Sequence, residues 1–216
     1  MASRADTGDR PPTRLIAFDL DGTLTRGPTC LEAAVTRYGL ADQLVHWRQA
    51  RTDQERATTR VQAWRELVHR AGPDHTAALA TIPLAPGATE GIAELRKAGL
   101  RTVIVSLAFA PHVAYFARRL GVDAWIATEP AEDGPFRHVF PTTKPLLLAE
   151  HAAALGLTTG QLAAVGDTPD DIPMLRSVGV SVYIGSGPTE GFTPTHWLRA
   201  GHLEQIARIL LAPGKG

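Results

Sequence analysis

The stretch LIAFDLDGTLT, from Leu15 to Thr25, decides the fold of this chain. A mostly apolar run leads into two aspartates, Asp19 and Asp21, which are separated by a single leucine. Ionised carboxylates repel each other and are costly to remove from water, so a buried strand does not end in two of them by default. The pattern therefore predicts a buried β-strand whose end carries two carboxylates with a chemical use.

Four further apolar runs are continuous and rich in β-branched residues, as strands covered on both faces are. Amphipathic stretches of helical length alternate with these runs. This alternation predicts an α/β fold, in which a parallel, Rossmann-like sheet has helices on both faces. The predicted strands are residues 14–20, 101–107, 123–128, 162–167 and 179–185, and the predicted helices of the core include 88–99, 110–121 and 144–156.

Residues 26–85 interrupt the alternation, because they contain no convincing strand. Two segments there begin with the spacing of a capping box, Thr29 with Glu32 and Thr52 with Glu55, which is typical of helix starts. The sequence thus predicts a helical insert directly after the strand that carries the aspartates. We expect a flexible N-terminus at 1–13, an α/β core formed by 14–25 and 86–216, and a small all-helical cap at 26–85.

The composition bears on the partners. The 22 basic and 22 acidic residues cancel, which gives no indication of a nucleic-acid binder held by bulk charge. The single cysteine, Cys30, excludes an internal disulfide. No apolar run reaches the roughly 18–20 residues that span a bilayer. We therefore expect a cytoplasmic protein, monomeric or homodimeric, that binds neither nucleic acid nor membrane.

Polar residues follow three of the predicted strands, at the edge where open α/β sheets bind ligands. Asp19 and Asp21 follow the first strand, Ser106 lies in the second, and GDTPDD, residues 166–171, follows the fourth. Converging carboxylates favour a hard cation such as Mg²⁺, which prefers oxygen ligands. The hydroxyl of Ser106 and the ammonium of Lys144 suit phosphate oxygens, and an aspartate can form an aspartyl-phosphate.

These four motifs, in this order, resemble those of the haloacid dehalogenase superfamily of phosphohydrolases. The early helical insert and VIVS…F resemble its phosphoserine-phosphatase-like branch, known as HAD-IB, which has a C1-type cap; the resemblance covers about residues 15–212. It implies that Asp19 is the nucleophile and that Asp21 is the acid and base. It further implies a phosphate site formed by Thr23, Ser106, Leu107 and Lys144, and a Mg²⁺ site formed by Asp19, Asp21 and Asp167 with support from Asp170 or Asp171.

The chain departs from that branch where the substrate would bind. Its second motif reads Ser106-Leu107-Ala108, where the branch commonly has Ser-Gly-Gly. Phosphoserine phosphatases carry a glutamate that grips the substrate's amino group, and Pro28 stands at the matching position here. The capping-box spacing indicates that Glu32 has a structural role. The candidate substrate contacts of the cap are Glu32, Arg56, Arg60 and Trp64.

The sequence therefore predicts a Mg²⁺-dependent phosphomonoester hydrolase that acts through an aspartyl-phosphate. Its substrate would be a small phosphorylated metabolite other than phosphoserine, such as a sugar or polyol phosphate. One alternative is a phosphotransferase or phosphomutase on the same scaffold, which passes the phosphoryl group to an alcohol instead of water. The other is a regulator that binds a phosphorylated ligand without catalysis.

Overall fold

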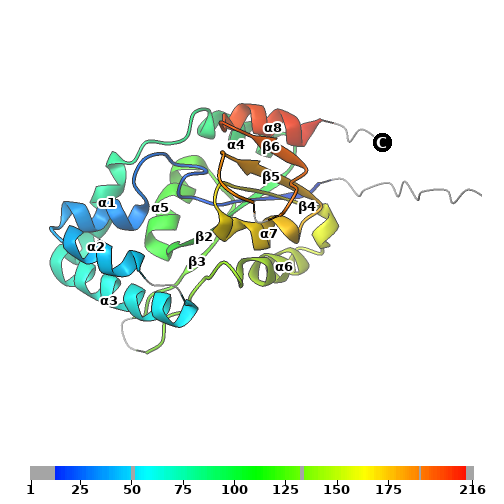
Figure 1. Ribbon diagram of the computed structural model, residues 1–216. Coiled ribbons are helices and arrows are strands. Elements are labelled where there is room, and N and C mark those ends of the chain that lie inside the picture. Colours follow the sequence, from blue (N-terminus) through cyan, green and yellow to red (C-terminus); the bar gives the residue numbers. More distant parts are fainter. Residues whose placement is uncertain (1–12, 50–51, 132–133, 190, 213–216) are drawn as a thin grey trace, which may run out of the picture.

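The computed structural model describes residues 13–49, 52–131, 134–189 and 191–212. Within these ranges the chain forms one parallel sheet with helices on both faces and a group of helices at one side (Figure 1). The predicted α/β fold class is confirmed. Residues 1–12 of the predicted flexible N-terminus lie outside the described residues.

The sheet has the strand order β3-β2-β1-β4-β5-β6, and all of its described pairs are parallel. The order reverses between β1 and β4, and ligands bind at such a switch point, outside the carboxyl ends of the strands. Five strands match the predicted ones, whereas the three residues of β6 carry too short a pattern to predict. The strands are β1 (Leu15–Phe18), β2 (Arg101–Phe109), β3 (Ala124–Thr128), β4 (Leu162–Gly166), β5 (Val180–Ile184) and β6 (His196–Leu198).

Alternate residues of the central strands face opposite sides of the sheet, as the pleat requires. Ile16 and Phe18 of β1 pack in the apolar cluster that includes α4, α5 and α8, whereas Leu15 and Ala17 pack in the cluster that includes α6 and α7. Figure 1 shows α4 and α8 above the sheet and α6 and α7 below it. These helices are α4 (Ala88–Lys97), α5 (Ala110–Leu120), α6 (Lys144–Ala154), α7 (Ile172–Arg176) and α8 (Leu203–Leu211).

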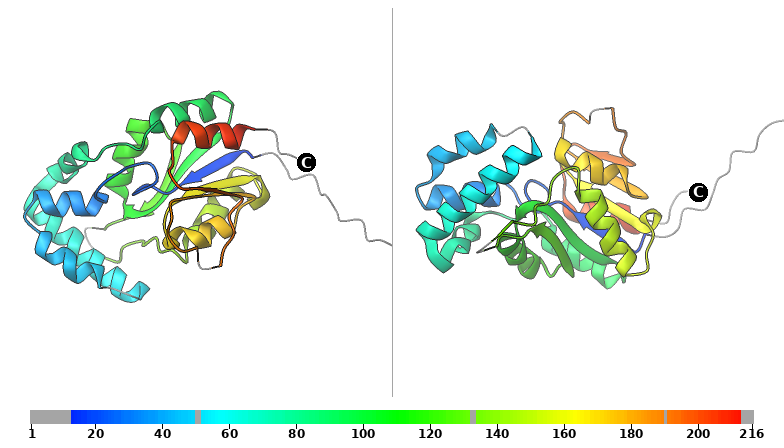
Figure 2. Two further views of the ribbon diagram at one scale, coloured as in Figure 1. Left: turned by 45° about the horizontal axis from the view of Figure 1, so that its top comes forward. Right: turned by 90° about the horizontal axis from the view of Figure 1, so that it is seen from below.

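The helices between β1 and α4 form the helical insert, which both views of Figure 2 show at one side of the core. Both predicted capping boxes are present, one formed by Thr29 with Glu32 and one by Thr52 with Glu55. Two helices were not predicted from the sequence, α2 in the insert and α8 in the core. The insert comprises α1 (Cys30–Arg37), α2 (Ala41–Arg48), α3 (Asp53–Ala71) and the 3₁₀ helix η1 (Gly72–Thr81).

The backbone connects the insert to the core beside a short bridge. Thr25, which follows β1, forms an antiparallel bridge with Leu84, which follows η1. The backbone N–H of Ala85 donates to the carbonyl of Leu24 at 2.8 Å. The chain therefore leaves and re-enters the core through two adjacent extended segments. In the described part of the chain, no helix has the length and apolar character needed to cross a membrane.

The contact between α4 and α8 generates a prediction about stability. A Cβ at Gly91 of α4 would lie 2.6 Å from the carbonyl oxygen of Leu203, at the start of α8. Gly→Ala in an unobstructed helix stabilises by about 1 kcal/mol, but here the helices must separate. We expect Gly91→Ala to lower the free energy of unfolding by about 1–3 kcal/mol. Urea unfolding measures the change, the exposed Glu90→Ala serves as the control, and a stabilised Gly91→Ala would contradict the prediction.

Candidate active site

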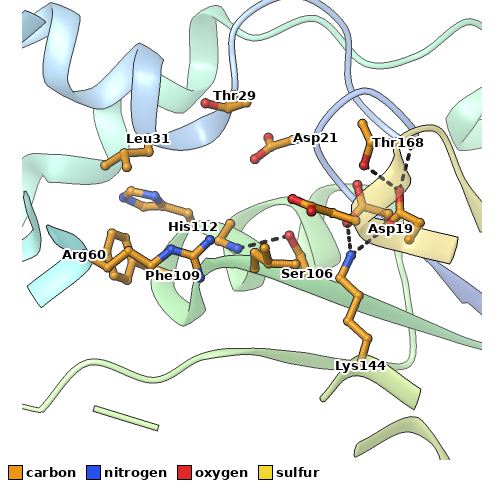
Figure 3. Close-up of a pocket in the computed structure, with 14 residues that line it drawn as sticks. Asp19, Asp21, Thr29, Leu31, Arg60, Ser106, Phe109, His112, Lys144 and Thr168 are labelled. Atoms are coloured by element: carbon orange, nitrogen blue, oxygen red, sulfur yellow. Dashed lines mark hydrogen bonds and ion pairs between the residues drawn. The ribbon is translucent and has the colours of Figure 1, made fainter. Parts of the chain in front are cut away.

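A cavity of about 260 Å³ opens at the carboxyl ends of the strands, between the core and the helical insert (Figure 3). Because β1 and β4 are neighbours, the residues that follow them meet at one edge of the sheet: the N–H of Asp19 donates to the carbonyl of Val165 at 2.9 Å. Eight of the predicted site residues line the cavity. They are Asp19, Asp21, Arg60, Ser106, Leu107, Lys144, Asp170 and Asp171.

Lys144 joins two carboxylates at the floor of the site. Its Nζ donates to Asp19 at 2.8 Å and to Asp171 at 2.6 Å, and all three side chains are buried. Burial by itself would lower the pKa of Lys144, but the charges of Asp171 and Asp19 outweigh it and raise the pKa above its usual value. The ammonium is therefore permanently charged and fixed beside Asp19.

Asp171 supports the loop after β4. Its second carboxylate oxygen accepts the backbone N–H groups of Asp167 and Thr168, both at 3.1 Å. A Cβ at Gly166 would lie 2.5 Å from the Cβ of Asp171, so the close approach requires glycine. Asp170, by contrast, is 47% exposed and lies 3.6 Å from Arg56. Of the two aspartates that the sequence left open, the geometry favours Asp171 as the one that supports the site.

Asp167 faces the loop that follows β1. The hydroxyl of Thr23 donates to its Oδ1 at 2.9 Å, so the structure places Thr23 beside Asp167 rather than in the cavity lining. Gly22 has a φ of +90°, and a side chain there would collide with the carboxylate of Asp167. The glycine of DLDGT is thus needed both for its backbone conformation and for the close approach of the two loops.

Carboxylates outnumber the nearby cations in this part of the site, and the pKa values of Asp19 and Asp167 lie above the usual value of an aspartate. Burial raises the pKa of Asp19, and the charge of Asp171 raises it further, although Lys144 opposes both. Burial also raises the pKa of Asp167 to about 6. Oxygens of Asp19, Asp167 and Asp171 lie within 4.8 Å of one another. A donor set of clustered carboxylates with excess negative charge fits a divalent cation of the hard type.

Asp21 lies on the other side of the cavity from Lys144 (Figure 3). Its Oδ1 accepts the backbone N–H of Cys30, the first residue of α1, at 2.9 Å. Burial raises the pKa of Asp21 to about 6, although the hydrogen bond from Cys30 opposes the shift. A carboxyl group with a pKa near neutrality suits proton transfer, because both of its protonation states are accessible.

Ser106 lies at an irregularity in β2. The register between β2 and β3 shifts between Val105 and Phe109, so the intervening residues leave the regular ladder. Such a bulge re-aims side chains beside functional sites. The hydroxyl of Ser106 accepts the backbone N–H of Ala108 at 3.2 Å, and Ser106, Leu107 and Ala108 all line the cavity. The strand therefore does not end at Leu107, as predicted, but continues to Phe109.

The candidate residues of the insert lie in different places. Arg60 lines the cavity and donates to the carbonyl of Val139 at 3.1 Å, whereas Arg56 pairs with Asp170. Glu32 accepts the backbone N–H of Thr29 at 2.8 Å in the capping box. Trp64 stands behind the lining, where its ring packs against Phe109 with centroids 4.7 Å apart.

Six residues that line the cavity were not predicted as site residues: Thr29, Leu31, Ala108, Phe109, His112 and Thr168. A signal for His112 was present: it lies in the first turn of the helix that directly follows the strand of Ser106. That placement alone directs a side chain toward the carboxyl edge of the sheet. Leu31 gave no such signal, because an apolar residue in an amphipathic helix is expected in the core.

The sequence matches the haloacid dehalogenase-like hydrolase family over residues 16–176. Because the match spans most of the chain, this protein belongs to that family. Its relatives include phosphatases, so the predicted family and the predicted phosphatase class of enzyme are confirmed.

Two curated relatives cover most of the chain. A phosphoserine phosphatase of Halobacterium salinarum is 30% identical over 91% of this chain and 96% of its own length. One of Albidiferax ferrireducens is 28% identical over 81% of this chain and 82% of its own length. Among solved structures, an apo phosphoserine phosphatase aligns with a TM-score of 0.71 at 22% identity, covering 91% of this chain and 98% of that one. This last likeness shows the shared fold.

The paired charges at Lys144 generate a second prediction. Lys144→Met keeps an unbranched side chain but leaves Asp19 and Asp171 buried without their cation. We expect the free energy of unfolding at pH 7, measured with a chelator present, to fall by about 3–5 kcal/mol. Protonation removes the uncompensated charge, so the difference from the wild type should shrink as the pH is lowered.

Urea unfolding at several pH values measures this difference. Lys97→Met, at an exposed position of α4, is the matched control. Equal stability of the two variants at pH 7 would show that the buried ion pairs do not stabilise the fold.

Proposed function

We propose that this protein is a Mg²⁺-dependent phosphomonoester hydrolase that acts on a small metabolite through an aspartyl-phosphate on Asp19. One observation carries the proposal: Lys144 holds Asp19 at 2.8 Å inside a cavity that also contains Asp21 and Ser106. A carboxylate held by a buried ammonium is fixed in position, and a negative phosphate next to it needs the same positive charge. Positioning and charge neutralisation are the main requirements of phosphoryl transfer.

Each residue then has one task. Asp19 attacks phosphorus, while Lys144 keeps the carboxylate oriented and offsets the charge of the phosphoryl oxygens. Ser106 supplies a hydroxyl to those oxygens. Asp21 gives its proton to the leaving oxygen and then takes one from the water that hydrolyses the aspartyl-phosphate, roles that suit its pKa of about 6. Mg²⁺, held by Asp19, Asp167 and the backbone carbonyl of Asp21, would supply further charge neutralisation and orient the phosphate.

We further propose that the substrate is not phosphoserine, although the curated relatives are phosphoserine phosphatases. An amino-acid substrate needs a carboxylate for its ammonium, and Pro28, at the position expected for that acid, is exposed and uncharged. The nearby Glu32 is engaged in the capping box of α1. A site of this kind favours a sugar or polyol phosphate, or another substrate without an amino group.

The assignment of the nucleophile is tested by Asp19→Asn. The amide cannot attack phosphorus, so we expect kcat to fall on the order of 10⁴–10⁶-fold. Asp42→Asn, at an exposed position of α2, is the control and should keep wild-type turnover. Beryllium fluoride, which mimics a bound phosphoryl group, should form its adduct on Asp19 in a crystal structure. An adduct on Asp21, or an active Asp19→Asn, would contradict the assignment.

The metal is tested by its removal. Dialysis against a chelator should abolish turnover, and Mg²⁺ should restore it, whereas Zn²⁺ should restore it poorly because the site offers only oxygen ligands. A binding readout comes from thermal unfolding, since a ligand of the native state raises the Tm. Mg²⁺ should raise the Tm of the wild type but not of Asp167→Asn. Full activity in excess chelator would refute this proposal.

A further inference from the structure

The end of the cavity remote from Lys144 contains a buried histidine. Figure 3 shows Leu31, Phe109, His112 and Arg60 at this end, with Ser106 between them and the Asp19–Lys144 pair. His112 is 0% exposed, and within the described residues neither of its ring nitrogens has a hydrogen-bond partner. Buried polar atoms without partners are rare and costly, so these nitrogens call for an explanation.

The surroundings of His112 keep its ring neutral. The rings packed against it are those of Trp64, Phe109 and His75, with centroids 5.6–5.9 Å away. Burial, assisted by the charge of His75, lowers the pKa of His112 to about 3. A neutral imidazole offers one N–H donor and one nitrogen acceptor. It therefore suits a partner that can both donate and accept, as a hydroxyl does.

Arg60 of α3 supplies a cation at the same end. Its one hydrogen bond in the described structure goes to the carbonyl of Val139, and a guanidinium has five N–H donors. Burial lowers the pKa of Arg60 to about 10, which still leaves the group charged at neutral pH. The planar fork of a guanidinium matches a carboxylate better than a single hydroxyl. The carboxylate of Asp170, also in the lining, is paired with Arg56.

From these two residues, and resting on the proposed function, we infer that the substrate is a small phosphorylated hydroxycarboxylic acid. Arg60 binds the carboxylate of the leaving group, and His112 exchanges hydrogen bonds with its hydroxyl. The 260 Å³ of the cavity must also hold the phosphate, which limits the acid to a few carbons. An ammonium in place of the hydroxyl would be repelled by Arg60 and would offer no acceptor to the N–H of His112.

Matched substrates test this inference. 3-Phosphoglycerate and O-phosphoserine differ only in a hydroxyl against an ammonium, and both enantiomers of each are compared by kcat/KM. We expect the hydroxy acid to be preferred by about tenfold or more, because an unpaired buried group strongly penalises the wrong ligand. Glycerol 3-phosphate, which lacks the carboxylate, and 3-phosphooxypropanoate, which lacks the hydroxyl, should each fall below 3-phosphoglycerate by a similar factor.

Variants test the two contacts separately. Each result is the ratio of two kcat/KM values measured on the same variant, so a loss of folded protein affects both values equally. His112→Phe keeps the ring shape, and the preference for 3-phosphoglycerate over 3-phosphooxypropanoate should fall toward one. His112→Gln retains a donor and an acceptor and should keep part of that preference. In Arg60→Gln, the preference for 3-phosphoglycerate over glycerol 3-phosphate should fall toward one. Arg65→Gln, at an exposed position of the same helix, should leave both ratios unchanged.

The outcomes separate this inference from the function on which it rests. If p-nitrophenyl phosphate is hydrolysed and kcat/KM for O-phosphoserine equals or exceeds that for 3-phosphoglycerate, the inferred substrate class is overturned. The proposed phosphatase activity would then still stand. Unchanged ratios in His112→Phe and Arg60→Gln would likewise overturn it. If no phosphate ester is hydrolysed in the presence of Mg²⁺, the proposed function and the substrate class both fail.

Discussion

The ammonium of Lys144 is the interaction on which the rest of the site depends. It lies between the carboxylates of Asp19 and Asp171, at 2.8 and 2.6 Å, and so connects β1, α6 and the loop after β4. Removing one partner from such a buried group leaves an uncompensated charge, which costs more than the pair itself contributes. The three segments are therefore held in one arrangement, and the remaining lone pairs of Asp171 fix the loop that carries Asp167.

The two ends of the cavity have different roles: one carries out the chemistry, and the other recognises the leaving group. The carboxylates and Lys144 come from the carboxyl edge of the sheet, whose strands are buried on both faces and fixed in register. The opposite end takes Leu31 and Arg60 from the helical insert and His112 from α5. Substitutions in the insert can therefore change the groups that meet the leaving group without disturbing the strand register that aligns Asp19.

The sequence predicts the chemical end of this cavity well and the other end poorly. Asp19, Ser106 and Lys144 belong to patterns that are rare by chance, and the strand periodicity placed the first two at one edge of the sheet. His112 belongs to no such pattern: its place in the first turn of the helix after the strand of Ser106 indicates the carboxyl edge of the sheet but not which groups its ring faces. The roles of Thr23 and Arg56 likewise depend on partners 144 and 114 residues away, Asp167 and Asp170, and only the folded chain reveals those contacts.

The way in which the insert joins the core has a mechanical consequence. The backbone passes between core and insert beside the bridge of Thr25 with Leu84. Elsewhere α3 meets the core through the packing of Trp64 against Phe109 and through polar contacts, which include Arg56 with Asp170, Arg60 with the carbonyl of Val139, and Asp53 with Thr142. The polar contacts are a partly exposed ion pair and two hydrogen bonds, each of which is weak where water can replace it. Movement of α3 away from the core, which would widen the cavity, therefore has to break these polar contacts and separate Trp64 from Phe109, while the backbone connection beside Thr25 and Leu84 stays intact.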